Sequence, residues 1–342
     1  MQPIATLHDF FTRSGAELRL YHMGRRVVPF DMATLCQFEA GELSWPAPWR
    51  QQARIACVFT LGDSEEPMIW FLALSLDEQG MLCPASRDAF IQRLLETLGR
   101  TITTLGERGP MVDNLMKDNP LAFTPSLTLQ AMLHAYASRD LERPASQHLE
   151  LAEEYLTGEH TLDWQALGLQ GLADFAVRHD REQAVRLANQ LDSLPSAALH
   201  SLCYCLEHVT IDDALAEALR QRGENAAAQG DVESLCACVR AMGGACERIA
   251  GPWFTELLED SAACGPDLLA AMAARGWEHL EDEQRLPRFL LRLAEQPNAD
   301  FAALARDLAQ IPRLRLPVLM YLRNAEAASP IGRRLAHLAS SA

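Results

Sequence analysis

The sequence contains almost no lysine and no long apolar run. Of its 30 basic residues only Lys117 is a lysine, which excludes catalytic schemes that need a second one. The most apolar segment, residues 68–76, ends at Asp77 and is much shorter than the roughly 18 residues that a membrane span needs. Residues 1–11 lack the basic start and apolar core of a secretory signal. These absences predict a cytoplasmic protein that does not contact a membrane.

The known motifs of catalysis and cofactor binding are absent as well. There is no H-E-x-x-H, G-x-S-x-G or C-x-x-C pattern and no glycine-rich phosphate loop. The nine cysteines include Cys203 with Cys205 and Cys236 with Cys238. Residues two apart on a helix point about 200° away from each other, so neither pair can hold one zinc ion. We therefore predict no catalytic residue, no cofactor and no metal site, and cysteines that pack in the core.

Charge is distributed unevenly along the chain, whose net charge is −16. Residues 1–120 carry 11 basic and 15 acidic side chains, a net charge of −4. Residues 121–284 carry 10 and 27, a net charge of −17, and residues 285–342 carry 9 and 4, a net charge of +5. The overall acidity disfavours a general nucleic-acid binder, because such affinity depends on neutralising phosphates. The basic C-terminal end is the clearest surface feature of the sequence.

Residues 1–100 have the pattern of an α+β domain. A short helix is expected over residues 7–12, followed by a hairpin of residues 17–21 and 25–30. Residues 54–61 and 68–76 are rich in Val, Ile, Phe and Trp, which favours a second pair of strands around a turn at residues 62–65. An amphipathic helix then begins at Pro84 and ends near Gly99. This order predicts a four-stranded antiparallel sheet with helices on one face.

The remainder of the chain predicts only helices, and it repeats at a spacing of 33 residues. Three columns are apolar throughout, and they lie at i, i+3 and i+4, the spacing of one helical face. The next column is charged at four of five positions, so we expect it to face solvent. The apolar columns are Leu169, Leu202, Leu235, Leu268 and Phe301; Leu172, Cys205, Cys238, Ala271 and Leu304; and Ala173, Leu206, Val239, Met272 and Ala305; the charged column is Asp174, Glu207, Arg240, Ala273 and Arg306.

A unit of two helices cannot bury its apolar face alone, so such units stack. We accordingly predict an α+β domain over residues 1–100, a connector over residues 101–124 and an all-α helical-repeat domain over residues 125–342. The repeat is expected to form a HEAT-like α-solenoid with a period of about 33 residues, since the ankyrin and tetratricopeptide signatures are absent.

Several segments resemble an uncharacterised bacterial protein family, a single domain of unknown function that spans about the whole chain. The resemblance is collinear from end to end. It implies no activity, and so it assigns no catalytic residue. The segments that carry it are M-G-R-R-V-V-P-F-D (residues 23–31), I-W-F-L-A-L-S-L-D-E-Q-G (69–80), N-P-L-A-F-T-P (119–125), G-L-Q-G-L-A-D (168–174) and G-D-V-E-S-L-C-A-C-V-R-A-M-G-G-A (230–245).

Two groups of residues are candidates for binding. Arginines near the C-terminus form the first group; three of them share one helical face, and we expect them to be exposed because the opposite face is apolar. Planar guanidinium groups suit carboxylates and phosphates. This group consists of Arg285, Arg288, Arg292, Arg313, Arg315, Arg333 and Arg334. The second group is a polar candidate site at the edge of the expected sheet, which consists of Arg25, Arg26, Asp31, Asp77 and Glu78.

The leading hypothesis is a protein–protein interaction adaptor or scaffold whose helical repeats bind a macromolecular partner, since solenoids offer long binding surfaces. One alternative is an enzyme or small-molecule sensor with its site in the α+β domain, near Arg25, Arg26 and Asp77. A second alternative is a nucleic-acid-associated protein that uses the basic C-terminal end. A purely structural explanation for the arginines is that they balance the acidic repeats within the molecule or in a head-to-tail oligomer. The sequence predicts neither the partner nor the oligomeric state.

Overall fold

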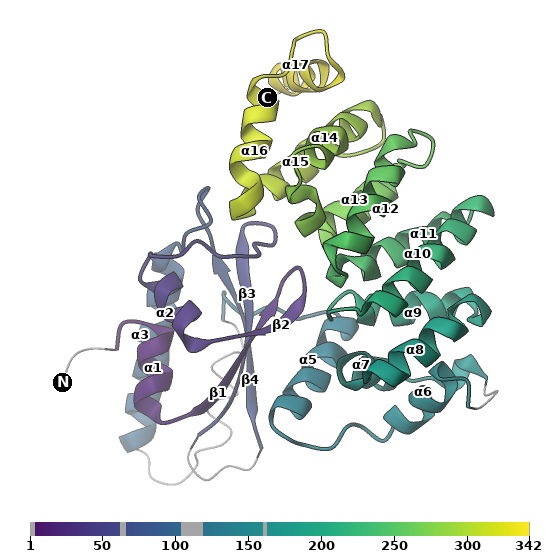
Figure 1. Ribbon diagram of the computed structural model, residues 1–342. Helices are drawn as coiled ribbons and strands as arrows, with labels where there is room; N and C mark the ends of the chain where they lie inside the picture. The colour runs from purple at the N-terminus through teal and green to yellow at the C-terminus, as the bar shows by residue number, and fades with distance from the viewer. Residues whose placement is uncertain (1–3, 62–65, 104–118, 160–162, 342) are drawn as a thin grey trace. The chain divides into compact units, whose positions relative to one another are not determined.

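The computed structural model describes residues 4–61, 66–103, 119–159 and 163–341 of the chain. The expected turn at residues 62–65 and most of the expected connector lie outside the described residues. The chain divides into two compact units (Figure 1), of which the first contains all the strands. Unit 1 is Met1–Ser126 with Gln310–Pro312, and unit 2 is Leu127–Ala309 with Arg313–Ala342.

The first unit contains the predicted four-stranded antiparallel sheet, in the order β2-β1-β3-β4. Its central pair is in register with Leu20 opposite Cys57, and Cys57 is in turn opposite Trp70 on the last strand. Side chains alternate between the two faces of a strand, so these positions share one face. The strands are β1 (Glu17–Met23), β2 (Val27–Phe30), β3 (Gln52–Thr60) and β4 (Met68–Ser75).

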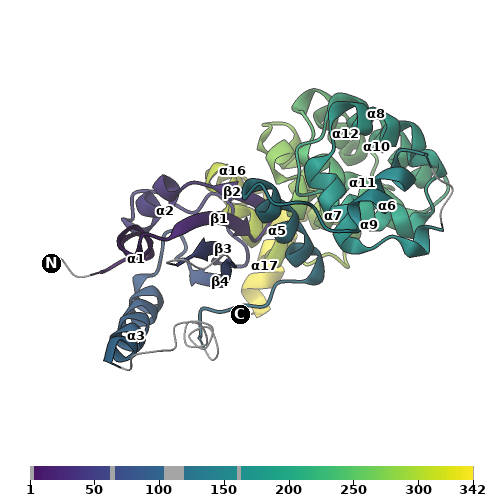
Figure 2. The same ribbon diagram turned by 90° about the horizontal axis from the view of Figure 1, so that it is seen from below.

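Three helices lie on the same side of this sheet (Figures 1 and 2). They are α1 (Leu7–Ser14), α2 (Met32–Glu39) and α3 (Pro84–Thr103). The first begins with a Thr6 side-chain cap and ends at Gly15, whose φ of 65° is a left-handed conformation that glycine adopts without strain. Phe10 and Phe11 from α1 pack on Trp70, with ring centroids 5.9 and 5.8 Å from it. The helices thereby bury the aromatic face of the sheet.

One histidine lies in this aromatic layer. The ring of His22 on β1 lies 4.6 Å from that of Phe30 and 4.7 Å from that of Trp45. Its Nδ1 atom is buried and has no hydrogen-bond partner among the described residues. Burial lowers the pKa of His22 to about 4, because the imidazolium would lose its hydration without compensation. This histidine therefore stays neutral in the fold at pH values where an unfolded chain would protonate it.

We expect His22→Phe to make unfolding less sensitive to acid. In the wild type the unfolded chain takes up the His22 proton near pH 6.5 and the folded chain only near pH 4. Folding stability is therefore lost as pH falls through that window, by up to about 3 kcal/mol, and the phenylalanine variant lacks this loss. Urea unfolding at several pH values measures the difference, with His134→Phe, a change at an exposed histidine, as the control. Equal pH slopes for wild type and His22→Phe would contradict this account.

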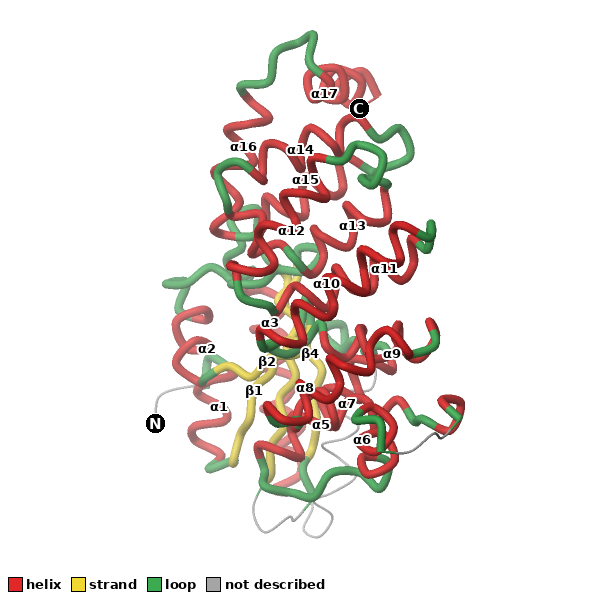
Figure 3. Tube along the Cα trace, turned by 45° about the vertical axis from the view of Figure 1, so that its right-hand side comes forward, coloured by secondary structure: helices red, strands yellow, loops and turns green. Residues whose placement is uncertain are grey.

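The second unit consists of helices in two rows that run alongside each other (Figure 3). In one row α5, α7, α9, α11 and α13 contact one another in sequence; in the other row α8, α10, α12 and α14 do so. The α-helices are α5 (Leu127–Asp140), α6 (Leu149–Leu156), α7 (Leu169–Arg178), α8 (Arg181–Gln190), α9 (Ser196–Leu206), α10 (Asp213–Ala228), α11 (Val232–Ala241), α12 (Glu247–Glu259), α13 (Pro266–Arg275), α14 (Arg285–Glu295), α15 (Phe301–Gln310), α16 (Pro312–Arg323) and α17 (Pro330–Ser341). Short 3-10 segments also occur: η1 (Trp164–Ala166), η2 (Leu191–Ser193), η3 (Met242–Gly244) and η4 (Trp277–Glu281).

The three apolar columns lie mostly in the core of this unit, as expected, but the charged column does not face solvent. Asp174 and Glu207 are buried, and of this column only Arg306 is exposed. Glu207 accepts hydrogen bonds from Arg240 at 2.7 and 3.0 Å and from Arg275 at 2.6 Å. The expectation was wrong for Glu207 because Arg240 and Arg275 on neighbouring helices pair with it. It was wrong for Asp174 because this carboxylate accepts hydrogen bonds from the Ser146 nitrogen and the Gln170 amide. Pairing allows ionised groups to be buried there.

Candidate interaction surface

The three arginines of α14 are engaged within the second unit. Arg285 is buried, contrary to the expected exposure, and Arg288 and Arg292 are partly buried. Arg285 donates from Nε to the His279 carbonyl at 2.7 Å and also pairs with Glu247. Arg288 pairs with Glu259 at 2.8 Å, and Arg292 donates from Nε to the Leu258 carbonyl at 2.9 Å. These guanidinium groups therefore join α14 to α12 and to the η4 segment.

The four later arginines differ in how much of the guanidinium is available. Arg334 donates to the carbonyls of Ala294 and Gln296 at the end of α14, so it is engaged. Arg313 has 81% of its side chain exposed and one ion pair, to Glu281 at 3.3 Å. Arg315 is partly buried and Arg333 is exposed, and within the described residues neither guanidinium group makes a hydrogen bond or ion pair. The structure thus leaves three of the seven candidate arginines free or nearly free.

Helix α16, which carries Arg313 and Arg315, also exposes an apolar face. It buries only Leu314 and Val318. Leu316 is 67% exposed, and Leu319, Met320 and Tyr321 are 48%, 44% and 43% exposed. The other exposed large apolar residues of the described second unit are spread over α5, α8, α11 and α17. Single exposed apolar residues are ordinary on a protein surface, whereas a contiguous group marks an interaction site.

We call this group the α16 face: Arg313, Leu316, Leu319, Met320, Tyr321 and Arg323. The apolar residues of the α16 face and Arg323 were not among the binding candidates that the sequence predicted. Leu316, Leu319, Met320 and Arg323 lie at i, i+3, i+4 and i+7, and this spacing places them along one side of a helix. The spacing was visible in the sequence, but it is typical of a buried face as well. Only the tertiary structure shows that no element covers it within the described second unit (Figure 3).

The five residues of the polar candidate site in the first unit differ in their burial and in their contacts. Arg25 is fully buried; it donates from Nε to the Pro48 carbonyl at 2.8 Å and lies over the Trp49 ring, 5.6 Å from its centroid. Arg26 is partly buried. Asp31 caps α2 by accepting from the Thr34 nitrogen at 2.8 Å, and the hydrogen bonds from Thr34 lower the pKa of this carboxyl.

Asp77 and Glu78 follow the last strand, and Asp77 has a local structural role. Asp77 accepts hydrogen bonds from the backbone nitrogens of Gln79 and Met81 at 2.7 and 2.9 Å, which closes the turn after β4. Glu78 is exposed. The Asp31 carboxylate therefore stabilises the start of α2, and the Asp77 carboxylate stabilises the turn after β4.

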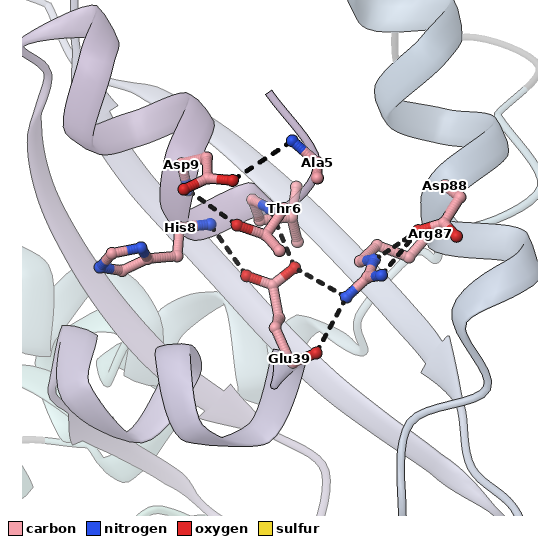
Figure 4. Close-up of polar contacts among 8 residues, drawn as sticks. Ala5, Thr6, His8, Asp9, Glu39, Arg87 and Asp88 are labelled. Atoms are coloured by element: carbon pink, nitrogen blue, oxygen red, sulfur yellow. Dashed lines mark hydrogen bonds and ion pairs between the residues drawn. The ribbon is translucent and has the colours of Figure 1, made fainter. Parts of the chain in front are cut away.

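A different polar cluster joins the three helices of the first unit (Figure 4). The buried Glu39 carboxylate accepts from the Leu7 and His8 nitrogens at 2.9 Å each. Arg87 donates from Nη1 to the Glu39 carbonyl at 3.2 Å, and the same Nη1 atom lies 3.7 Å from the Glu39 carboxylate. Burial raises the pKa of Glu39, although these donors act in the opposite direction. Since the carboxylate caps α1 and the His8 ring points away from it in Figure 4, we interpret the cluster as structural.

One polar chain in the second unit has the residue types of a hydrolase triad. His200 Nε2 lies 2.9 Å from Ser234 Oγ, and His200 Nδ1 lies 3.4 Å from Glu233 Oε1. A nucleophile must reach its substrate. Ser234 is fully buried and sits in the first turn of α11, where its nitrogen bonds the Asp231 cap at 3.1 Å. These side chains therefore link α9 to α11, and Ser234 is too deeply buried to act as a nucleophile.

The cysteines that the sequence assigns to the core are largely in it. Cys203, Cys205 and Cys238 are fully buried, and Cys236 is partly buried. Burial raises the pKa of the Cys205 thiol to about 12, so it remains protonated at neutral pH. Across the described part of the chain, no three His, Cys, Asp or Glu side chains are grouped as metal ligands. Nor does any described helix have both the length and the apolar character that crossing a bilayer requires.

The chain belongs to the family whose model is described as a protein of unknown function, DUF3549, which matches residues 2–339. A single family domain thus spans both units. Comparisons with curated proteins and with solved structures each found no match.

Proposed function

We propose that this family member is an interaction adaptor or scaffold, in which the helical unit binds a macromolecular partner through the α16 face. The observation that carries the proposal is the exposure of four large apolar side chains on α16, three of which, Leu316, Leu319 and Met320, lie on one side of the helix. Leaving such a group in water is unfavourable, so a bound partner gains the free energy of its burial. The α+β unit would supply a second contact.

We further propose that the second unit is a HEAT-like α-solenoid with a period of about 33 residues. Side-chain bonds between neighbouring units of the repeat support this. Arg240 bonds Glu207, Cys246 bonds Asp213 and Asn225 is near Asp192, and each pair is 33 residues apart. Bonds at one fixed spacing are what stacked equivalent units produce.

The two alternatives have less support. An enzyme or sensor in the first unit would need convergent polar groups, but Asp31 and Asp77 each bond a residue two or three positions along the chain, and Arg25 bonds the Pro48 carbonyl. A nucleic-acid-associated protein would need free guanidinium groups along the basic end, but Arg285 and Arg292 are engaged with α12 and its surroundings. A purely structural role, in which arginines balance acidic helices, fits the α14 arginines and does not account for the α16 face.

Affinity purification with variant chains tests the adaptor function. We expect wild-type chain to recover one protein at near-equal stoichiometry from extract of its native cells. Leu316→Ser with Met320→Ser should lower that recovery at least about tenfold, because two central apolar contacts are lost. The matched control is Val185→Ser with Val232→Ser, which removes two isolated exposed apolar side chains on α8 and α11.

Quantitative mass spectrometry measures the recovery, and the interaction is then reconstituted from the two purified proteins. All variants should keep the melting temperature of the wild type, since every substituted side chain is exposed. If both pairs of substitutions reduced recovery equally, or if no stoichiometric protein were recovered, the α16 face would not be the binding surface of an adaptor.

A further inference from the structure

We infer that the α16 face binds an amphipathic helix of a partner protein that carries carboxylates beside its apolar stripe, an inference that depends on the proposed adaptor function. The geometry of the face points to a helix. Arg313, Leu316, Met320 and Arg323 lie at i, i+3, i+7 and i+10 and so share one side of α16. The two arginines are about 15 Å apart along the axis, with the apolar side chains between them.

A helix that packs along this side meets two kinds of contact. In the middle it meets Leu316, Leu319 and Met320, which span about one helical turn and can contact an apolar stripe of similar length. At both ends it meets a guanidinium group. A partner helix with acidic residues about 15 Å apart, on either side of its apolar stripe, would match both features.

The charges around the face favour carboxylates. Residues 311–323 contain three arginines and no acidic residue. Arg323 is exposed and, within the described residues, its guanidinium group makes no hydrogen bond or ion pair, and that of Arg313 is held by Glu281 alone at 3.3 Å. An exposed ion pair of this kind contributes little, so a partner carboxylate can replace Glu281 at small cost. Each new pair is partly shielded from water by the apolar contacts and is therefore stronger than an exposed pair.

A second copy of the chain fits the face poorly. Two α16 faces packed against each other would bring Arg313 and Arg323 of one copy beside those of the other, and like charges repel. The acidic cavity beside α6 could accept arginines, because Glu150, Glu153, Glu154 and Glu159 line it. Its aliphatic lining is only Ala145 and Leu149, which is too little to cover the large side chains of α16.

A lipid surface also fits poorly. Anionic lipids attract arginines, but they repel acidic protein surface within a Debye length. Residues 121–284 carry a net charge of −17, and they form most of the unit that would approach the bilayer with α16. The face therefore suits a compact acidic partner helix better than an extended anionic surface.

Synthetic peptides test this inference with the full chain. The acidic probe is a helical peptide of about four turns with leucines along one side and glutamates at both ends of that side. The basic probe has lysines in place of the glutamates. By fluorescence anisotropy we expect the acidic probe to bind at least about tenfold more tightly than the basic probe, and its affinity to fall as salt rises.

Two variants and one control make the result specific. Arg313→Glu with Arg323→Glu should reverse the preference, so that the basic probe binds more tightly. Leu316→Ser with Met320→Ser should weaken both probes, and Arg306→Glu, at an exposed arginine on α15, should change neither. Reversal by the charge variant, together with retention by the control, supports the inference.

Several outcomes would overturn it. They are equal binding of the two probes by wild type, tighter binding to vesicles of phosphatidylglycerol than to the acidic probe, or self-association in sedimentation that Arg313→Glu with Arg323→Glu abolishes. Failure of the probes does not decide the adaptor function. If the probes fail while a recovered protein still depends on Leu316 and Met320, the adaptor function stands and the partner lacks an acidic helix.

Discussion

Leu235→Asp is expected to lower the free energy of unfolding by more than about 4 kcal/mol. Leu235 is 3% exposed on α11, which packs between α9 and α13. The substitution removes a buried apolar side chain and places an unpaired carboxylate in a site that cannot hydrate it. Urea unfolding followed by circular dichroism measures the loss, and thermal unfolding provides a second readout.

Two further variants control this prediction. Leu202→Asp should have a similar effect, because Leu202 occupies the equivalent position on α9 and is fully buried. Val232→Asp on the same helix should be nearly neutral, since Val232 is 50% exposed and stands in the first turn, where an acidic residue is favourable. An unchanged midpoint for Leu235→Asp would mean that the assignment of α11 to the core is wrong, and with it the 33-residue register.

Glu207→Ala is expected to cost about 3–5 kcal/mol, because it removes the buried carboxylate that pairs with the buried Arg275 and the partly buried Arg240. Glu207 is 2% exposed and bonds both Arg240 and Arg275, and His208 Nε2 lies 3.6 Å from it. The control is Glu217→Ala on α10, where an exposed pair with Arg220 should contribute less than about 1 kcal/mol. Equal losses for the two variants would contradict the role of the buried network.

The same network predicts how stability depends on pH. Burial by itself would raise the pKa of Glu207, but Arg275, His208 and Arg240 together bring it below its usual value of 4.5. The unfolded chain therefore binds this proton first as pH falls, so the stabilisation is present above about pH 4.5 and is lost at lower pH.

Arg240→Glu should also destabilise the fold, contrary to what a solvent-facing position would imply, because it places a second carboxylate beside Glu207.

Local patterns in the sequence were sufficient for the secondary structure and the class of fold. The Val, Ile, Phe and Trp content of residues 54–61 and 68–76 predicted two strands, and the structure has strands there, β3 (Gln52–Thr60) and β4 (Met68–Ser75). The apolar columns through Leu202, Leu235 and Leu268 predicted buried helical faces. These features depend on neighbours within a few residues, and such neighbours are visible in the sequence.

The position of charged residues could not be predicted in the same way. Arg285, Arg288 and Arg292 share one face of α14, and a single helix offers no reason to bury that face. The structure engages them because α12 brings Glu247 and Glu259 beside them from about 30 residues earlier in the chain. Glu207 and Arg275, 68 residues apart, show the same dependence on packing.

The sequence by itself determined the family, the four-stranded antiparallel sheet, the helical remainder and the uneven charge. Only the tertiary structure decided which side chains remain accessible: it buried Arg285 and left Leu316 and Met320 in water. The physical reason is that hydrophobic periodicity defines a face, whereas burial depends on whether another element covers that face. For α16 no element of the described second unit covers it, and this makes α16 the candidate site.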